Sequence, residues 1–540
     1  MNAPPFTHGL TAAATDAGAS VLETEVLIIG GGVTGTGIMR DLALRGIHSI
    51  LIDKRDLCAG ASGGNHGLLH SGARYVSTDL AAAIECQQEG ALLKRLAPQC
   101  IEAAGGLFVA VQGDDAAFAE HFPALCARAG IDCEAISVAE ARQLEPLLSD
   151  RLVTALRVPD ATIDPFHLAL LNVGHARQLT GSVYLPHTEL LGFESADGHL
   201  HSATCRDPLS QRTLTLRARQ FVNAGGAWSM AIARLAGCTD VHLLYAKGTL
   251  LVTNERLTRH VVNRLRPPAD GDILVPGGSV SLLGTTSSRT DDLEHVSPTA
   301  DEIDRNLREG AAMIPALAKA RYIRAFSRVR PLLQAAPGAS DRAATRGFAL
   351  LDHRLQGLSN FCTITGGKLT TYRLMAEKAA DLVAARLGNR QPCSTRLVAL
   401  PEDPACGWSD PGSAPKRLFQ TNDPDDLILC ECELLSQSAI AQIFAGAPGI
   451  DAQPTLESIA LRSRAGKGPC QGSFCGIRIG SYLYDQGLRH DRSGLTDLRH
   501  FFDERFRGQR SVSWGQQAAQ LELAEAMHCG LLGLDTLGDD

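Results

Sequence analysis

Four cysteines near the end of the chain have a spacing that suits a metal centre. One residue separates Cys430 from Cys432, and Cys470 and Cys475 follow after 37 residues, with four residues between them. Four thiolates presented in pairs can bind a 2Fe–2S cluster. Paired zinc ligands usually leave a wider gap, and a disulfide is disfavoured in a reducing compartment. The spacing therefore predicts an iron–sulfur cluster, with zinc or thiols without a metal as the alternatives.

A second group of reactive residues is the arginine-rich segment 321–346. It holds six arginines and one acidic residue, Asp341, in a chain whose net charge is −8. Within residues 326–332 the arginines alternate with other residues, which predicts a strand with Arg328 and Arg330 on one face. Two guanidiniums on one face can form forked hydrogen bonds to a phosphate, whereas a solvated charged surface is the alternative. We expect an anion site in this segment.

The N-terminal part of the chain has the spacing of a dinucleotide-binding turn. An apolar run enters residues 30–35, which fit G-x-G-x-x-G, and a helix-like stretch follows. Gly30 would make the tight turn, Gly32 would let the backbone approach a pyrophosphate, and Gly35 would allow close packing of helix and strand. The helix N-terminus would face the phosphate charge. The next apolar run ends at Asp53, whose carboxylate can hold ribose hydroxyls.

Three further stretches rich in small residues lie far apart, at 59–75, 221–228 and 366–371. Small residues let a ligand lie against the backbone. Remote stretches that converge on one ligand suit a long, buried cofactor, so we expect FAD. Besides the turn and Asp53, the residues expected to contact it are Ser62, Asn65, Gly67, Ala224, Gly225, Gly366, Gly367, Leu369 and Thr370.

Length and composition limit the other possibilities. A chain of 540 residues exceeds the size of a single core, so at least two domains are expected. No apolar run is long enough to span a bilayer, and the negative charge disfavours nucleic acid as a partner. The 15 cysteines, mostly without regular spacing, indicate a reducing cytoplasm. We expect a flexible tail at 1–22, a dehydrogenase region at 23–390, a linker at 391–425, a ferredoxin-like domain at 426–485 and a helical extension at 486–540.

Taken together, these motifs resemble the FAD-dependent glycerol-3-phosphate dehydrogenases. The similarity rests on residues 30–37, 65–75, 329–332 and 365–373 and runs from about residue 23 to 535. The cysteines and the preceding residues 464–469 resemble the bacterioferritin-associated ferredoxin-like domain, which makes the chain closer to the A subunits of the anaerobic, three-subunit members. The resemblance implies an α/β fold: a Rossmann-like FAD domain of the glycine/D-amino-acid-oxidase type with an interleaved α+β substrate cap, plus a small C-terminal 2Fe–2S domain.

The same resemblance implies roles for residues of a substrate pocket. Arg330 and Arg346 would hold a substrate phosphate. His66 and His70 are the candidate bases for the hydroxyl proton, and the alternative for each is a loop histidine bonded to backbone. Relatives often have Gly where this chain has Arg328, an extra cation that would either tighten phosphate binding or pair elsewhere. The resemblance thus implies Arg74, Tyr75, Arg330 and Arg346 for substrate binding and Lys368 near the substrate hydroxyl or the flavin. His66 and His70, chosen for their place in the small-residue loop, complete the expected catalytic set with Lys368.

We therefore expect an enzyme that oxidises sn-glycerol 3-phosphate to dihydroxyacetone phosphate by hydride transfer to FAD. Electrons would pass through the 2Fe–2S cluster to partner subunits and a membrane quinone, with the protein on the cytoplasmic face of the inner membrane. One alternative is an FAD/2Fe–2S oxidoreductase of a 2-hydroxy acid or an amino acid. Another is an electron-transfer or redox-sensing module without a small substrate.

Overall fold

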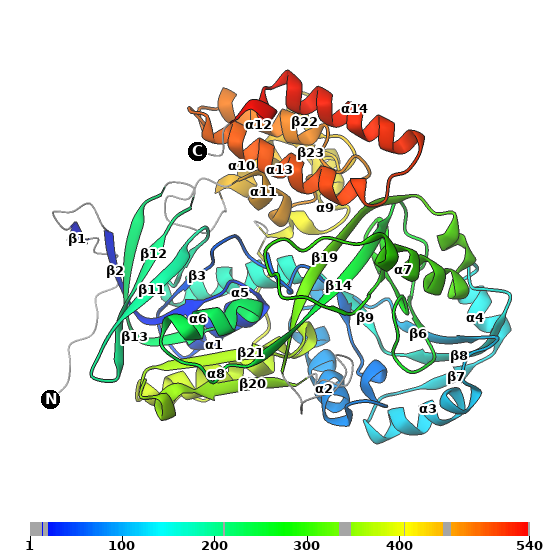
Figure 1. Ribbon diagram of the computed structural model, residues 1–540, viewed down its shortest axis with the longest axis horizontal. Helices are drawn as coiled ribbons and strands as arrows, with labels where there is room; N and C mark the ends of the chain where they lie inside the picture. Colours follow the sequence, from blue (N-terminus) through cyan, green and yellow to red (C-terminus); the bar gives the residue numbers. More distant parts are fainter. Residues whose placement is uncertain are drawn as a thin grey trace.

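The computed structural model describes residues 13–14, 20–208, 211–333, 347–403, 406–445 and 455–537. In Figure 1 two sheet-containing domains lie side by side, and a mostly helical C-terminal domain lies above both of them. The structure confirms the expected α/β fold with a second, mixed sheet beside the first. Within the described residues, no helix is both long and apolar enough to cross a membrane.

The first sheet is built around the apolar strand that enters the glycine turn. Its described strands are β1 (Ala13–Ala14), β2 (Ser20–Ile29), β3 (Ser49–Ile52), β10 (Val183–Leu185), β11 (Glu189–Ala196), β12 (His199–Arg206), β13 (Thr213–Asn223), β20 (Phe348–Asp352) and β21 (Phe361–Gly366). Strands β10, β3, β2, β13 and β21 run parallel, while β11 and β12 extend the sheet in antiparallel order. Val26, Leu27 and Ile28 are fully buried, as expected for a parallel strand covered on both faces.

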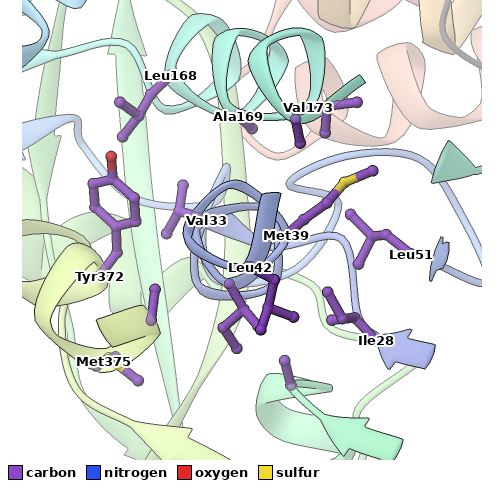
Figure 2. Packing of buried hydrophobic residues seen from close by; sticks show 14 of the residues in the cluster. Ile28, Val33, Met39, Leu42, Leu51, Leu168, Ala169, Val173, Tyr372 and Met375 are labelled. Carbon is purple, nitrogen blue, oxygen red and sulfur yellow. The ribbon is translucent and has the colours of Figure 1, made fainter. Parts of the chain in front are cut away.

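Helix α1 (Val33–Leu44) is the centre of the largest core. It lies between the first sheet, α5 (Pro165–Thr180) and α8 (Tyr372–Arg386), and Figure 2 shows Met39 and Leu42 surrounded by side chains from all three. Helix α5 begins where Asp164 accepts hydrogen bonds from the first-turn amides and ends at Gly181 with positive φ. This packing fixes the direction in which the N-terminus of α1 points.

The second sheet forms the cap. Its described strands are β6 (Gly106–Val111), β7 (Glu134–Ile136), β8 (Leu152–Val158), β14 (Leu243–Thr253), β15 (Val261–Arg264), β16 (Ile273–Gly277), β17 (Val280–Gly284), β18 (Ser288–Arg289) and β19 (Tyr322–Leu333). Strand β19 pairs with β14, so that Gly248 lies opposite Arg328 and Ala246 opposite Arg330. Both arginines are half-buried and alternate with buried residues, which puts them on one face as predicted.

The remaining elements connect and cover these sheets. They are a small sheet of β4 (Leu68–Leu69), β5 (Ile101–Glu102) and β9 (Ala161–Ile163), the helices α2 (Leu80–Leu96), α3 (Ala116–Arg128), α4 (Val138–Leu144), α6 (Ser229–Leu235) and α7 (Ala300–Met313), and the 3-10 turn η6 (Leu369–Thr371). Helix α7 begins with a capping box made by Thr299 and Glu302.

The C-terminal domain has a core of its own. Its described elements are α9 (Ser413–Thr421), β22 (Ile428–Cys430), β23 (Leu435–Ser436), α10 (Gln437–Ala445), α11 (Leu456–Arg462), α12 (Cys475–Asp485), α13 (Ser493–Arg510) and α14 (Gln516–Leu531). Phe501, Phe502 and Phe506 of α13 are the large side chains of this core. Trp408 and Ala414, which fall within the expected linker 391–425, are also packed into it. Helices α11 and α13 contact the two larger domains.

Close contact between α1 and the glycine turn gives a stability prediction. A Cβ added at Gly35 would lie 1.9 Å from the Gly30 carbonyl oxygen, so helix and strand would have to separate. We expect Gly35→Ala to lower the free energy of unfolding by about 2 kcal/mol or more. Gly480→Ala is the matched control, because a Cβ in α12 meets no atom within 4 Å. This helical substitution should raise stability by up to about 1 kcal/mol. Thermal denaturation of both variants checks the prediction, and equal stabilities would contradict it.

Candidate active site

A cavity of about 780 Å³ lies between the first sheet and the cap. Its size is that of a cofactor or ligand site, and residues from both domains form its walls. The predicted site residues that line it are Gly30, Gly32, Asp53, Ser62, Asn65, His66, His70, Arg74, Tyr75, Ala224, Gly225, Arg330, Gly366, Gly367, Lys368 and Leu369. The structure thus brings segments from across the chain to one cavity.

The glycine turn places the N-terminus of α1 at the cavity wall. Gly30 has φ +118°, and a Cβ there would lie 2.4 Å from the carbonyl oxygen of Ala224, so only glycine fits this contact. Helix α1 begins directly after Gly32. The Val33 N–H donates to Ser62 Oγ at 3.1 Å. This open helix end, with Gly32 at its cap, can receive the pyrophosphate of a dinucleotide.

Asp53 holds the turn in place while its carboxylate lines the cavity. Its Oδ2 accepts a hydrogen bond from the Gly31 N–H at 2.7 Å, and Oδ1 accepts one from the Arg55 N–H at 2.8 Å. Burial raises the pKa of Asp53, and these backbone hydrogen bonds partly oppose that rise. The residue lies where a carboxylate can bind ribose hydroxyls, and it also stiffens the loop that carries it.

Three predicted cofactor residues lie behind the cavity wall. Gly35 packs α1 against the turn, as described above. Gly67 has φ +69°, and its carbonyl accepts a hydrogen bond from the Ile163 N–H at 2.7 Å. Thr370 is buried, and its Oγ1 accepts a hydrogen bond from the His70 N–H at 3.2 Å. These residues position the loops that form the wall. Arg346 lies outside the described residues.

Arg330 lies in a pocket that its neighbours shape. Its guanidinium donates to the carbonyl of Thr286 at 2.6 Å and to Thr285 Oγ1 at 3.3 Å. A Cβ at Gly248 of the facing strand would lie 2.8 Å from Arg330 Nη2, so this glycine leaves room for the guanidinium. Neither residues 285–286 nor Gly248 were among the predicted site residues. Their contribution to the site can be recognised only once β14, β17 and β19 are known to be neighbours.

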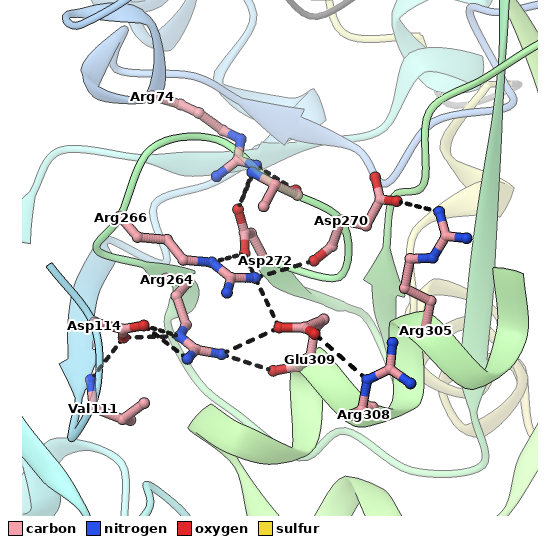
Figure 3. Close-up of polar contacts among 11 residues, drawn as sticks. Arg74, Val111, Asp114, Arg264, Arg266, Asp270, Asp272, Arg305, Arg308 and Glu309 are labelled. Atoms are coloured by element: carbon pink, nitrogen blue, oxygen red, sulfur yellow. Dashed lines mark hydrogen bonds and ion pairs between the residues drawn. The ribbon is translucent and has the colours of Figure 1, made fainter.

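Arg74 is oriented by a carboxylate that the sequence did not single out. Its Nη2 donates to Asp272 Oδ2 at 3.1 Å and to the carbonyl of Ala269 at 3.2 Å. Asp272 is fully buried and also accepts from Arg266 Nη2 at 2.7 Å (Figure 3). Such a charge-assisted network fixes the guanidinium of Arg74 at the cavity wall.

His66 is electrically neutral between the two cations. Burial, and then the charges of Arg74 and Arg330, lower the pKa of His66 to about 3. The Leu68 N–H donates to His66 Nδ1 at 3.3 Å, which places the proton of the neutral ring on Nε2. In this state His66 can donate a hydrogen bond to a ligand oxygen, but it does not take up a proton at neutral pH. The end of the cavity at Arg74, Arg330 and His66 can therefore bind an anion.

His70, Tyr75 and Lys368 form a second polar group in the same cavity. His70 Nε2 lies 3.4 Å from the hydroxyl of Tyr75, and the two ring centroids are 5.1 Å apart. Lys368 Nζ lies 5.5 Å from the centroid of the Tyr75 ring. A histidine hydrogen-bonded to a phenol, with an ammonium nearby, can accept and relay a proton.

Three further cations line the cavity: Arg328, for which the sequence left two roles open, and Lys54 and Arg55, which were not predicted. A Cβ at Gly64 would lie 1.9 Å from Arg328 Cγ, so the stem of Arg328 crosses the small-residue loop. Arg328 and Arg55 both line the cavity, and Arg55 adds to the effect of burial in lowering the pKa of Arg328. Lys54 Nζ lies 4.4 Å from the ring centroid of Trp228. Lys54 is paired with Glu294, which leaves Arg55 and Arg328 as the cations that suit the phosphates of a dinucleotide.

The four predicted cysteines converge in the C-terminal domain. Sγ–Sγ distances are 3.8 Å for Cys430–Cys432 and for Cys432–Cys470, and the Cys475 thiol contacts those of Cys430 and Cys470. All four are free thiols. A Cβ at Gly468 would lie 2.5 Å from Cys432 Sγ, so this glycine lets the loop pass close to the sulfurs. Contacts from Cys432 and Cys475, then the Gly472 and Phe474 N–H groups, lower the pKa of Cys470. This donor set fits a four-thiolate cluster.

The parallel sheet, the glycine turn and the capped cavity are those of a dinucleotide-binding protein. Residues 25–382 match the family model described as FAD dependent oxidoreductase (DAO). The chain is 39% identical over 538 residues to the A subunit of anaerobic glycerol-3-phosphate dehydrogenase from Escherichia coli (strain K12), covering 95% of this chain and 97% of that protein. It is 36% identical to the A1 subunit of anaerobic glycerol-3-phosphate dehydrogenase from Haloferax volcanii, covering 94% of this chain and 91% of that protein.

The chain therefore belongs to the FAD-dependent oxidoreductases and, within them, to the family of these A subunits. The predicted family and the predicted FAD are confirmed. The fold is similar to the solved structure of the glycerol-3-phosphate dehydrogenase from Bacillus halodurans complexed with FAD. That likeness has a TM-score of 0.63 at 19% identity and covers 91% of this chain and 96% of that one.

The neutral state of His66 predicts a pH dependence of stability. Its pKa in the folded protein is about 3 against an ordinary 6.5, so the unfolded chain takes up the proton first as pH falls. Stability contributed by His66 is therefore lost progressively below pH 6.5, with a slope of up to about 1.4 kcal/mol per pH unit. We expect the free energy of unfolding of His66→Gln to fall less steeply in this window. Denaturation of both proteins across this pH window gives the comparison. Equal slopes of the free energy of unfolding against pH would show that the pKa of His66 is not lowered by folding.

Proposed function

We propose that the chain oxidises sn-glycerol 3-phosphate to dihydroxyacetone phosphate, with FAD as the oxidant. The observation that carries this proposal is the anion-binding end of the cavity, where Arg74 and Arg330 lie near the neutral His66. Relatives that match nearly the whole chain are named as subunits of glycerol-3-phosphate dehydrogenases, which supports the same substrate. A cavity shared by a dinucleotide-binding turn and a phosphate-binding end suits a small phosphorylated alcohol.

The substrate phosphate would lie between the two guanidiniums. Arg330 is held by the Thr285–Thr286 turn and Arg74 by Asp272, so both cations are oriented before the ligand arrives. Preorganised donors lose little entropy when they bind. His66 would add a hydrogen bond from Nε2 to a phosphate or hydroxyl oxygen. The phosphate end fixes the position of the carbon to be oxidised.

Oxidation of the alcohol also requires that its hydroxyl lose a proton. His66 is a poor base because its pKa is about 3. We assign proton removal to the group of His70, Tyr75 and Lys368, with His70 as the acceptor and Lys368 stabilising the developing oxygen charge. FAD, when bound, supplies the two-electron redox chemistry. The turn at Gly30–Gly32, Asp53, Ser62 and Gly366–Gly367 would hold it.

We further propose that Cys430, Cys432, Cys470 and Cys475 bind a 2Fe–2S cluster that takes electrons from the flavin. Their convergence as free thiols supports this assignment. Residues 426–485, with the helices that follow, would form the cluster domain. Electrons would leave for partner subunits and a membrane quinone on the cytoplasmic side of the inner membrane. The relatives' designation as A subunits supports the existence of partner subunits.

Substrate-driven loss of flavin colour tests the proposed reaction. Anaerobic protein with bound FAD is mixed separately with sn-glycerol 3-phosphate, glycerol, lactate and an amino acid. We expect bleaching with the phosphorylated substrate alone, because the other compounds carry no phosphate for the two guanidiniums to bind. Bleaching by lactate or an amino acid, without bleaching by sn-glycerol 3-phosphate, would transfer the assignment to a 2-hydroxy-acid or amino-acid oxidoreductase. An oxidised flavin with every compound would favour a module without a small substrate.

Removal of Arg330 should weaken substrate binding strongly. Loss of one member of a buried charge pair costs about 2–5 kcal/mol, so Arg330→Ala should raise KM roughly thirty-fold or more. Arg305→Ala is the matched control, since Arg305 lies on α7 of the same cap, pairs with Asp270 and is half exposed. Steady-state kinetics with a dye acceptor give both values. A KM for Arg330→Ala equal to that of the control would remove Arg330 from the site.

Removal of one cluster cysteine should abolish the cluster without emptying the flavin site. Cys475→Ser replaces a buried thiol of the converging group, whereas Cys529→Ser replaces a half-buried thiol of α14. We expect stoichiometric iron and acid-labile sulfide in the wild type and in Cys529→Ser, and neither in Cys475→Ser, with FAD retained in all three. Zinc in place of iron in the wild type, lost in Cys475→Ser, would decide for the zinc alternative.

A further inference from the structure

A buried ion pair joins the flavin-binding domain to the C-terminal domain. Arg462 Nη1 donates to Asp56 Oδ2 at 2.7 Å, and the two side chains are 4% and 2% exposed. Asp56 lies just after β3, three residues beyond Asp53, whereas Arg462 is the last residue of α11. The pair therefore connects the first domain to a helix that packs into both cores, with Leu461 in the core of α1 and Ile459 in the C-terminal core.

The carboxylate of Asp56 accepts further hydrogen bonds from both domains. Ser458 Oγ of α11 donates to Asp56 Oδ2 at 2.7 Å, and Tyr184 of the first sheet donates to Oδ1 at 3.0 Å. The Leu57 N–H donates to Oδ1 at 2.7 Å. A buried charge pair is favourable only when such additional hydrogen bonds complete it, and geometry is then tightly fixed.

Both ends of the pair continue directly into a redox site. The chain after Asp56 becomes the small-residue loop 59–65, which lines the cavity. The chain after Arg462 becomes the loop that leads to Cys470. Phe166 of α5 lies between the same two loops: Lys467 Nζ is 4.9 Å from its ring centroid, and a Cβ at Gly63 would lie 2.6 Å from its Cζ.

We propose that Asp56 and Arg462 are positioning residues that hold the cluster loop against the flavin loop, so that electron transfer between the two sites is fast. This inference rests on the proposed function, because it requires a flavin and a cluster in one chain. Other contacts also dock the domains, among them Arg464 with Ser279 and Gly508 of α13 against Arg324. Loss of the pair should therefore shift the loops locally and leave the domains associated.

The two electrons from each substrate molecule would pass from the flavin site to the cluster one at a time. Each substrate molecule releases two electrons to the flavin site, and the cluster accepts one electron at a time. A one-electron acceptor of the ferricenium type reoxidises the cluster after each transfer. The pair itself exchanges neither electrons nor protons. Its removal should slow the transfers and leave substrate oxidation at the flavin unchanged.

Rapid mixing of the holoprotein with sn-glycerol 3-phosphate separates these two steps. Absorbance follows the flavin, and freeze-quench electron paramagnetic resonance follows the cluster. In Arg462→Met we expect flavin bleaching at the wild-type rate and cluster reduction slowed by about tenfold or more, since small misplacements of reacting groups carry such costs. Arg462→Lys, which keeps the charge, should recover most of the rate.

Arg45→Met is the matched control. Arg45 forms an equally buried ion pair with Asp41, with side chains 4% and 0% exposed, and both residues belong to the first domain. Arg45→Met should lower the free energy of unfolding as Arg462→Met does, but it should not slow cluster reduction. Cluster reduction at the wild-type rate in Arg462→Met would overturn the proposal. A wild-type protein whose flavin does not bleach with this substrate would instead overturn the proposed function.

Hydrogen exchange of the protein without its cofactors gives a readout independent of redox activity. We expect Arg462→Met to speed amide exchange in 56–63 and 458–467 together, and Arg45→Met to leave both unchanged. Faster exchange in 458–467 alone would show that the pair stabilises α11 without holding the flavin loop, and would overturn the proposal even for a variant that loses its cluster.

Discussion

The close approach of two backbones, Gly30 and Ala224, is the constraint on which the site depends. A Cβ at Gly30 would lie 2.4 Å from the Ala224 carbonyl oxygen, so the strand can turn into α1 only because no side chain is present. Helix α1 is then held by the sheet, α5 and α8, and its N-terminus faces the cavity. A helix end that can receive a phosphate is thereby built into the core of the protein.

The charged and titratable side chains of the cavity fall into two groups that can do different chemistry. Arg74 and Arg330 are positive and fixed, and together with burial they keep His66 neutral as a hydrogen-bond donor. His70 lies with Tyr75 and Lys368, where a proton can be accepted. Two histidines of one short loop, both plausible bases from sequence, are thus separated by their surroundings. The structure favours His70 for this role.

Local patterns allowed much of this arrangement to be predicted. The segment β2–α1–β3 follows from an apolar run and glycine spacing, and the face shared by Arg328 and Arg330 follows from strand alternation. Contacts between remote segments could not be predicted in this way. Arg74 and Asp272 are 198 residues apart in sequence, and Asp56 and Arg462 are 406 apart. Trp408, within the expected linker, packs into the C-terminal core, and its turn contacts both the earlier helix α5 and the later helices α9 and α11.

In the proposed reaction, substrate electrons enter at the flavin and reach a cluster in the same chain. Electron paramagnetic resonance tests this in the anaerobic protein after addition of sn-glycerol 3-phosphate, with FAD bound and after FAD has been removed. We expect a reduced-cluster signal only when FAD is bound. A cluster that dithionite reduces but the substrate does not, although the bound flavin has bleached, would contradict it.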